Sequence, residues 1–431
     1  MSNLVMDKKF VCTEGDGNHN KFWNVKVYSD GILETVYGRV GDSGGSTRKD
    51  FGSEDSAIRE AEKMIRKKER GKNKNGARVS VYQEVEIVGT VSANNNSKKS
   101  VGKSAWKAIA QGDSEVESLI AMFDKENVHN ITSGTSLTYD ETTGLFSTPL
   151  GVVGQNSIDE ARTVLSEIKS FVEKKKFTKE ADRLAEKFMM IIPQNIGRTR
   201  PTLKTICPTL DKLDEHNSIL DSLQASLDIV LAPKDDDSKD DTVDFGVTLS
   251  VLNDKKEFDR VNKFFGKTRQ SKHVCHHLNM QKIFVVDHKT MSADFEKSGK
   301  SIGNVMELWH GTRVGNILSI LAKGMYIPPS SASHCTGRMF GNGVYFSDQS
   351  TKSLNYSYGY WSGKSSNHCF MFLFDVAMGK SYTPSSYGGR NLPKSGYDST
   401  FAKAGQSGVM NNEMIVYKTY QCCPKYLIEF K

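Results

Sequence analysis

The chain has 431 residues, of which 37% are hydrophobic and 25% are charged, with a formal net charge of +7. Both fractions are ordinary for folded proteins, so the composition excludes a wholly disordered chain. At roughly 150 residues per domain, the length indicates about three domains, each able to bury its own core. The apolar runs are much shorter than the roughly 18 residues that a membrane-spanning helix needs, so we expect no membrane partner.

The cysteines and the N-terminus indicate a reducing compartment. The seven cysteines are irregularly spaced and odd in number, and no apolar segment follows the N-terminus. This pattern is typical of free thiols in the cytosol or nucleus and argues against secretion.

Two segments without hydrophobic periodicity divide the chain. Residues 91–104 are rich in Ser, Asn and Lys, and residues 233–241 form a charged run. We therefore expect a first domain at residues 1–90, a linker at 91–112, a second domain at 113–232 and a third at 242–431.

The first domain carries strand patterns followed by one helix pattern. Residues 22–28 and 32–37 alternate as strands do, and a glycine-rich turn follows at residues 41–45. Apolar residues then recur at helical spacing from Ala57 to Ile65. We expect a small antiparallel sheet with one helix.

The second domain carries three helix patterns. Ser157 and Glu160 form a capping box at the start of one of them. Two further helices are expected over residues 179–192 and 210–231. Apolar stripes of this kind are nearly always core, so we predict an all-α bundle without chemistry of its own.

The third domain is rich in Gly, Tyr and Phe, with short apolar runs separated by long polar segments. This pattern predicts buried strands joined by long loops, in an α+β or mainly β domain. The expected strands are residues 282–286, 370–376, 414–417 and 426–430.

Two segments partly match known ligand-binding motifs, a phosphate-binding loop and a zinc site, but both matches are incomplete. Three Gly-Lys-Ser tripeptides, at residues 102–104, 363–365 and 379–381, lack the earlier glycine that a phosphate-binding loop requires. The segment from His273 to His277 holds three histidines and a cysteine but has no second ligand pair elsewhere. We therefore expect a polar loop there rather than a zinc site, and no metal.

The informative segments lie in the third domain. They are WHGTR at residues 309–313, GRMFGNGVYFSD at 337–348, TKSLNY at 351–356 and NEMIVY at 412–417. Closely spaced glycines let a backbone approach a ligand, and tyrosines offer flat faces for a planar ring. Glu413 is a carboxylate directly before an apolar strand, at the rim of a sheet. Singly, such residues are more often structural or solvated; together they predict a site for a planar, polar ligand.

These segments closely resemble the catalytic domain of the poly(ADP-ribose) polymerases, a family of ADP-ribosyltransferases. The family patterns H-G-[ST]-R, G-x-x-F-G-x-G-[IV]-Y-F and N-E-[YM]-[IV]-[IV]-Y match in order and spacing. Residues 192–201 resemble the helical regulatory domain of the DNA-dependent members. Residues 36–41 resemble their WGR domain, with Tyr37 in place of the usual Trp. The resemblance implies an α+β multidomain fold: a WGR-like sheet with one helix, an all-α regulatory bundle and an α+β catalytic domain.

The resemblance implies NAD⁺ as substrate and a catalytic set of His310, Tyr345 and Glu413. In such enzymes the bond between nicotinamide and ribose breaks, and Glu413 would grip the ribose and stabilise the positive charge that develops there. The NAD⁺-binding residues would be His310, Gly311, Thr312, Asn316, Tyr345, Ser353 and Tyr356, with Met339 and Lys352 toward the acceptor.

The expected partner of the first domain is a DNA strand break with a 5′-phosphate. The segment from Arg59 to Arg78 has nine basic and three acidic residues. Such a run suits salt-sensitive, sequence-independent phosphate binding, although it also suits a solvated helix face or a nuclear-import signal. We expect a nuclear protein whose acceptors include itself and histones. The expected DNA or interdomain contacts are Tyr37, Arg39, Lys67 and Lys68.

The activity expected from the resemblance is DNA-break-activated transfer of ADP-ribose to protein side chains and to growing poly(ADP-ribose), with DNA loosening an inhibitory helical domain. Two alternatives remain open. Asn342 stands where polymer-forming relatives usually carry Lys, which favours a mono-ADP-ribosyltransferase. A catalytically silent DNA-binding scaffold is the other alternative, and the intact set of His310, Tyr345 and Glu413 argues against it.

Overall fold

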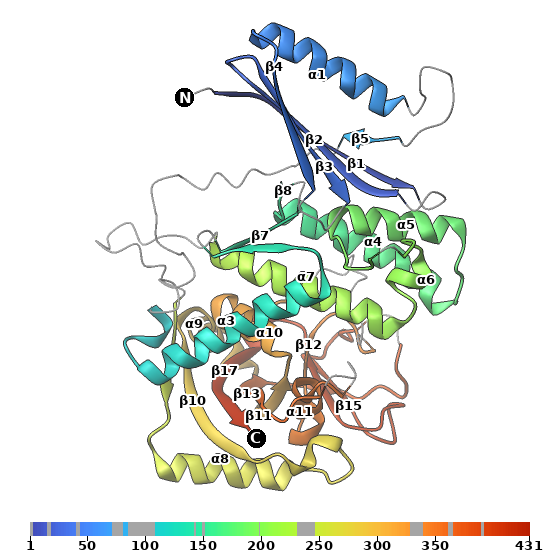
Figure 1. Cartoon of the computed structure of the whole chain (residues 1–431). Helices are drawn as coiled ribbons and strands as arrows, with labels where there is room; N and C mark the ends of the chain where they lie inside the picture. Colours follow the sequence, from blue (N-terminus) through green and yellow to red (C-terminus); the bar gives the residue numbers. More distant parts are fainter. Residues whose placement is uncertain are drawn as a thin grey trace. The chain divides into compact units, whose positions relative to one another are not determined.

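The computed structural model divides into two compact units, Met1–Asn96 with Asn130–Leu223, and Ser97–His129 with Gln224–Lys431 (Figure 1). Within the described residues, no helix is both long and apolar enough to cross a membrane. The predicted linker up to residue 107, the run at 233–241 and part of the glycine-rich turn lie outside the described residues. The structure describes residues 3–14, 19–39, 44–70, 81–84, 108–141, 144–148, 151–197, 199–230, 246–327, 339–360, 365–388 and 392–431.

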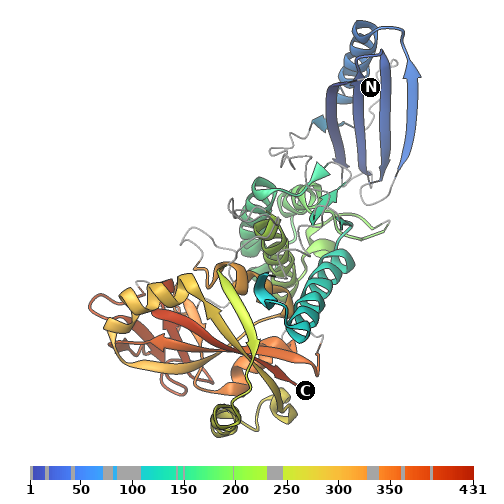
Figure 2. The same ribbon diagram turned by 90° about the vertical axis from the view of Figure 1, so that its left-hand side faces the viewer.

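The first unit opens with a five-stranded antiparallel sheet in the order β4-β3-β2-β1-β5, with helix α1 along one face (Figure 2). The two predicted strands and the helix are confirmed, and β1, β4 and β5 are additional. The bounds are β1 Leu4–Glu14, β2 His19–Tyr28, β3 Ile32–Arg39, β4 Gly45–Asp50, α1 Glu54–Glu69 and β5 Gln83–Glu84.

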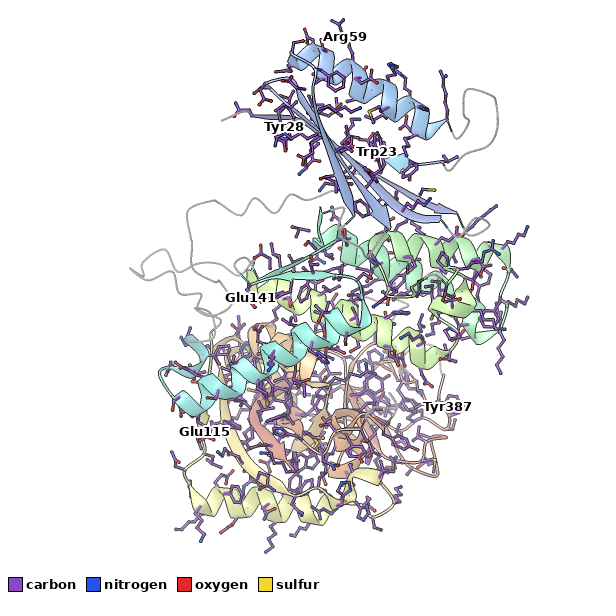
Figure 3. The ribbon with its side chains drawn as sticks, in the orientation of Figure 1. Trp23, Tyr28, Arg59, Glu115, Glu141 and Tyr387 are labelled. Atoms are coloured by element: carbon purple, nitrogen blue, oxygen red, sulfur yellow. The ribbon has the colours of Figure 1, made fainter. Side chains whose placement is uncertain are left out.

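The core of this sheet lies under α1. Alternate strand residues Phe10, Trp23 and Val25 are buried against Ala61 and Ile65 of the helix. Because successive strand residues face opposite sides, the period of two places these apolar residues on one face. Figure 3 shows Trp23 beneath α1 and Arg59 on the helix's outer surface.

The remainder of the first unit is mainly helical and corrects two predictions. Helix α4 begins at Gln155 after Gly154, so Ser157 lies inside its first turn and the predicted capping box is wrong. The all-α prediction is also wrong, because a three-stranded sheet precedes α4; strands of two to four residues leave no alternation to detect. The bounds are β6 Thr138–Asp140, β7 Leu145–Thr148, β8 Gly151–Val152, α4 Gln155–Glu173, α5 Lys179–Ile191, α6 Leu203–Ile206 and α7 Leu210–Val230.

The predicted helices at 179–192 and 210–231 are confirmed to within one residue as α5 and α7. Thr178 caps α5 by accepting from the Ala181 amide, at 3.3 Å. A helix that the sequence analysis did not identify, α3, covers Ser114–Gly134. Its first part, up to His129, belongs to the second unit.

The second unit contains two sheets, ordered β11-β13-β17-β10-β9 and β12-β16-β15-β14. They meet where the Trp309 and Ser347 backbones exchange two hydrogen bonds of 3.0 Å. The strands are β9 Val247–Val251, β10 Met280–His288, β11 Val305–Gly311, β12 Val344–Phe346, β13 Cys369–Ala377, β14 Ser381–Tyr382, β15 Ser399–Ala402, β16 Glu413–Val416 and β17 Cys422–Phe430.

All four strands predicted in this unit are confirmed, and the unit also contains helices that were not predicted. The first part of α3 packs on the sheet, with Phe123 edge-on to Phe370 at a ring distance of 4.8 Å and Glu115 paired with Lys282. The further helices are α8 Lys255–Thr268, α9 Lys289–Asp294, α10 Val314–Lys323 and α11 Ser350–Tyr358.

Candidate active site

Strand β11 presents His310 to the second sheet in one tautomer. The Nδ1 atom of His310 lies 2.9 Å from the carbonyl oxygen of Tyr345. Because a carbonyl can only accept, Nδ1 carries the hydrogen and Nε2 keeps a free lone pair. Burial lowers the pKa of His310 to about 4, and the nearby charge of Lys352 acts in the same direction. At neutral pH this side chain is therefore an uncharged hydrogen-bond acceptor.

Helix α11 lies directly against the end of β11. A Cβ atom on Gly311 would overlap the carbonyl oxygen of Ser353, so only glycine allows this approach. The Ser353 hydroxyl donates to the carbonyl oxygen of Trp309, at 3.0 Å. Gly311 and Ser353, both expected among the NAD⁺-binding residues, are thus neighbours.

The phenol of Tyr345 fixes the turn that precedes its own strand. Its hydroxyl donates to the carbonyl oxygen of Gly341 at 2.8 Å and accepts from the Phe340 amide at 3.0 Å. Gly341 has a φ of +86°, and a Cβ on Gly343 would lie 2.5 Å from Ile415. These glycines therefore allow close packing within the protein.

Glu413 and Lys352 form a buried ion pair. Glu413 begins β16 with 7% of its surface exposed, and Lys352 lies on α11 with 5% exposed. Burial raises the pKa of Glu413, and the positive charge of Lys352 opposes that rise. Glu413, expected directly before an apolar strand, is thus the first residue of that strand and is buried. Lys352 also lies 5.4 Å from the centre of the Tyr356 ring, which is 44% exposed.

The backbone just before Glu413 is held by side chains of the segment between β12 and α11. The side-chain amide of Asn412 donates to the Asp348 carboxylate at 2.8 Å, and the Ser347 hydroxyl donates to the backbone carbonyl oxygen of Asn412 at 3.0 Å. Motif matching included these three residues but gave them no role. Their signal in the sequence was only their presence within the matched segments.

The other predicted NAD⁺-binding residues lie around the start of α10. Thr312 is buried and accepts from the Asn316 amide, at 3.1 Å. The buried Oδ1 atom of Asn316 has no hydrogen-bond partner among the described residues. Met339, expected on the acceptor side, is 37% exposed.

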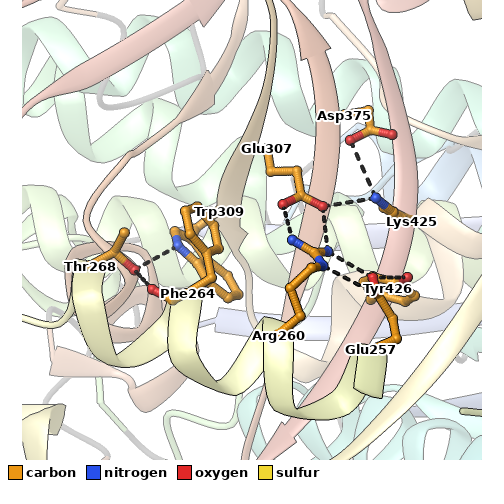
Figure 4. A network of polar contacts seen from close by, with 9 residues as sticks. All are labelled: Glu257, Arg260, Phe264, Thr268, Glu307, Trp309, Asp375, Lys425 and Tyr426. Carbon is orange, nitrogen blue, oxygen red and sulfur yellow. Dashed lines mark hydrogen bonds and ion pairs between the residues drawn. The ribbon is translucent and has the colours of Figure 1, made fainter. Parts of the chain in front are cut away.

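The opposite face of β11 is fixed by α8 (Figure 4). The indole of Trp309 donates to Thr268 at 3.1 Å, and Arg260 bridges Glu257 and Glu307 with N–O distances of 2.6 to 2.8 Å. Because alternate residues of a strand face opposite sides, Trp309 and Glu307 anchor the strand that presents His310.

The side chains predicted to contact DNA in the first unit differ in their exposure to solvent and in their contacts within the protein. Tyr37 is 46% exposed, and Lys67 is exposed on α1. The Lys68 ammonium lies over the rings of Tyr82 and Trp23, at 4.4 and 5.6 Å, and burial lowers its pKa. Arg39 is the last residue of β3, and its side chain lies outside the described part.

Much of the remaining charge on α1 is paired. Lys63 lies 3.1 Å from Glu60, and Arg66 lies 3.7 Å from Glu62. The end of the basic run, beyond Arg70, lies outside the described residues. Across those that are described, no group of three or more His, Cys, Asp or Glu side chains could hold a metal ion.

Comparison with known proteins identifies the class. Residues 255–406 match the poly(ADP-ribose) polymerase catalytic domain, 6–76 match the WGR domain and 113–244 match the poly(ADP-ribose) polymerase regulatory domain. The chain therefore belongs to the poly(ADP-ribose) polymerase family, in its form with WGR, regulatory and catalytic domains.

The curated relatives are similar at 26–31% identity. Poly [ADP-ribose] polymerase 2 of Arabidopsis thaliana is 28% identical over 320 residues, covering 66% of this chain and 49% of the relative. Poly [ADP-ribose] polymerase of Drosophila melanogaster is 31% identical over 240 residues, covering 54% and 23% respectively. The chain thus aligns with about half, or less, of the length of these relatives.

Proposed function

We propose that this chain cleaves the nicotinamide–ribose bond of NAD⁺ and transfers ADP-ribose to protein side chains and to growing poly(ADP-ribose), and that DNA strand breaks activate it. The observation that carries the proposal is the buried pair of Glu413 and Lys352 in the same cluster as His310 and Tyr345. Membership of the family supports the reaction class.

Glu413 is the proposed stabiliser of the reacting ribose. As nicotinamide leaves, the ribose gains positive, oxocarbenium-like character. A fixed carboxylate in a water-poor site stabilises that charge more in the transition state than in the ground state. Lys352 favours the ionised form of Glu413, because the ammonium opposes the rise in the carboxyl pKa that burial causes. On the acceptor side, Glu413 would polarise the incoming hydroxyl, with Met339 and Lys352 nearby.

The neutral groups account for binding of NAD⁺. His310 offers its Nε2 lone pair, which suits a ribose hydroxyl that donates. The Ser353 hydroxyl already donates to Trp309, so its oxygen is available to accept from the nicotinamide amide, beside the Gly311 main chain. Tyr356, with its half-exposed ring, would stack on nicotinamide, with Tyr345 on the opposite side. Thr312 and Asn316 would complete the NAD⁺ site at the start of α10.

The WGR domain is the proposed sensor of DNA breaks with a 5′-phosphate, through Tyr37, Arg39, Lys67 and Lys68. Phosphate binding by lysines and arginines is sequence-independent, which suits recognition of breaks. DNA binding would then loosen the regulatory domain. We place the protein in the nucleus on the same grounds, with itself and histones among its acceptors.

Incubation with labelled NAD⁺, with and without a 5′-phosphorylated nicked duplex, tests the proposal on a denaturing gel. We expect labelled protein that increases severalfold with the nicked duplex. No label in either lane would overturn the enzyme proposal and favour a silent DNA-binding scaffold. A smear indicates polymer, whereas a sharp band indicates mono-ADP-ribosylation, the alternative that Asn342 favours. Equal label in both lanes would reject activation by DNA but leave the proposed transferase activity in place.

A further inference from the structure

The loop at residues 270–275, which follows α8, contacts both segments that carry the Lys352–Glu413 pair. It contains the first residues of the His273–His277 segment, which failed as a zinc motif. None of its residues belongs to the set proposed to bind NAD⁺. Its contacts run to Thr351, which precedes Lys352, and to Asn411, two residues before Glu413.

On one side, the loop grips the first turn of α11 through Thr351. The backbone amide of Gln270 donates to the Thr351 hydroxyl at 2.9 Å, and His273 Nδ1 lies 2.9 Å from the same oxygen. The Cys275 thiol donates to the Thr351 carbonyl oxygen at 3.2 Å. Thr351 is fully buried, so these contacts replace water for its hydroxyl and its carbonyl oxygen.

On the other side, the loop holds the segment before β16. His273 Nε2 lies 3.2 Å from Oδ1 of Asn411, and the Lys272 ammonium donates to the Met410 carbonyl oxygen at 3.2 Å. His273 is 6% exposed, so its ring can exchange neither partner for water without opening the loop. One imidazole therefore spans the two segments with its two nitrogens.

We propose that His273 is a positioning residue that fixes the Lys352-bearing turn relative to the Glu413-bearing strand. The segments are far apart in the chain, so their relative placement depends on contacts of this kind. A carboxylate displaced by about 1 Å can lose as much as 10²-fold in rate, because transition-state stabilisation depends on geometry. The expected effect on rate rests on the proposed NAD⁺ chemistry; the structural link does not.

The test uses variants of the full chain that break one or both links. His273→Ala removes both links that the imidazole makes and leaves the other bonds of the loop to the two segments in place. His273→Asn keeps a polar atom near the Nδ1 position and so the link to Thr351, whereas His273→Gln keeps one near Nε2 and so the link to Asn411. Asn411→Ala removes the second link from the other side. The matched control is His276→Asn, since His276 is exposed, its Nδ1 atom lies 2.9 Å from the His273 carbonyl oxygen, and in the described part of the chain its ring bonds to neither Thr351 nor Asn411.

Two measurements are made on each variant: kcat and KM for NAD⁺, and hydrogen exchange of the backbone amides at residues 351–353 and 411–414. We expect His273→Ala to lower kcat about 10- to 100-fold with KM changed less than about threefold. The Asn and Gln variants should fall between it and the wild type. Asn411→Ala should add little to His273→Ala, because both remove the same link. Exchange should quicken at both segments in His273→Ala, and at residues 411–414 only in His273→Asn.

A wild-type kcat in His273→Ala, or an equal loss in His276→Asn, would overturn the proposal. So would losses in the three His273 variants that only follow the fraction of folded protein, measured by thermal unfolding. If the wild type shows no transferase activity, the proposed function fails, and hydrogen exchange alone then tests the positioning role of His273. Unchanged exchange at both segments in His273→Ala would reject that role, and faster exchange would support it.

Discussion

The two regions with most of the chemistry use charge in opposite ways. In the catalytic unit, one ion pair, Lys352–Glu413, is almost completely buried. On α1 of the WGR domain, the pairs Lys63–Glu60 and Arg66–Glu62 are largely exposed. Buried charges interact strongly and lose much when one partner is removed, whereas exposed pairs are screened and contribute little. The same residue types are therefore expected to interact strongly in the second unit and only weakly on α1.

The variant Glu413→Gln is expected to have the largest effect, and it tests the contrast between the buried and the exposed ion pairs. It removes the proposed transition-state carboxylate, so we expect kcat to fall about 10²- to 10³-fold. It also leaves the Lys352 ammonium buried without its partner, which should destabilise the fold by about 3 kcal/mol. Steady-state kinetics and urea unfolding measure the two effects.

The double variant Glu413→Gln with Lys352→Met separates stability from catalysis. With both charges gone, most of the lost stability should return, because no unpaired charge remains buried. Activity should stay low. Full transfer by either variant would remove Glu413 from its proposed role.

The second prediction concerns pH and Lys352→Met alone. Burial already raises the pKa of Glu413, and loss of the ammonium removes the effect that opposes the rise. The proposed active form is the carboxylate, so the acidic limb of the kcat profile should move to higher pH. The deficit relative to the wild type should be larger at pH 6 than at pH 8. A uniform loss across pH would mean that Lys352 acts on the acceptor instead.

The sequence could supply candidate residues for the site but not the contacts that hold them in place. Motifs supplied His310, Ser353 and Glu413, because the chemistry depends on residue identity and the spacing follows the strands. The links through His273 could not be found, since its partners Thr351 and Asn411 lie 78 and 138 residues away. No local periodicity encodes such contacts.

The wrong predictions have local physical causes. Motif matching also did not predict the packing role of Gly341 and Gly343, where a Cβ would meet Leu392 or Ile415 of the protein itself. The capping box failed because Gly154 begins α4 earlier than Ser157, without a side-chain hydrogen bond. The elements found correctly include the amphipathic helix α5 and the continuous apolar strand β13.

The third prediction compares neighbouring lysines of α1. Lys67 is exposed, whereas the Lys68 ammonium lies 4.4 Å from the Tyr82 ring and also near Trp23. Lys67→Gln should therefore weaken binding to a nicked duplex and reduce the salt slope by about one. Lys68→Gln should weaken it less but destabilise the domain by about 0.5–1 kcal/mol through the lost cation–π contacts. Salt titrations of fluorescence anisotropy give the slopes; a larger DNA effect from Lys68 would reverse the assignment.

The smallest expected effect on stability comes from the exposed pairs. Glu62→Gln frees Arg66 from a partner 3.7 Å away and should change unfolding free energy by less than about 0.5 kcal/mol. If α1 faces DNA, it should tighten DNA binding, because the freed guanidinium can contact phosphate. Glu69→Gln, on the last turn of the same helix, makes the same change in net charge without breaking an ion pair seen in the structure, and is the control. A larger gain for Glu62→Gln than for Glu69→Gln would mean that pairing masks the basic run. Equal gains in DNA affinity would mean that only net charge matters. No gain in either variant would mean that α1 does not contact DNA.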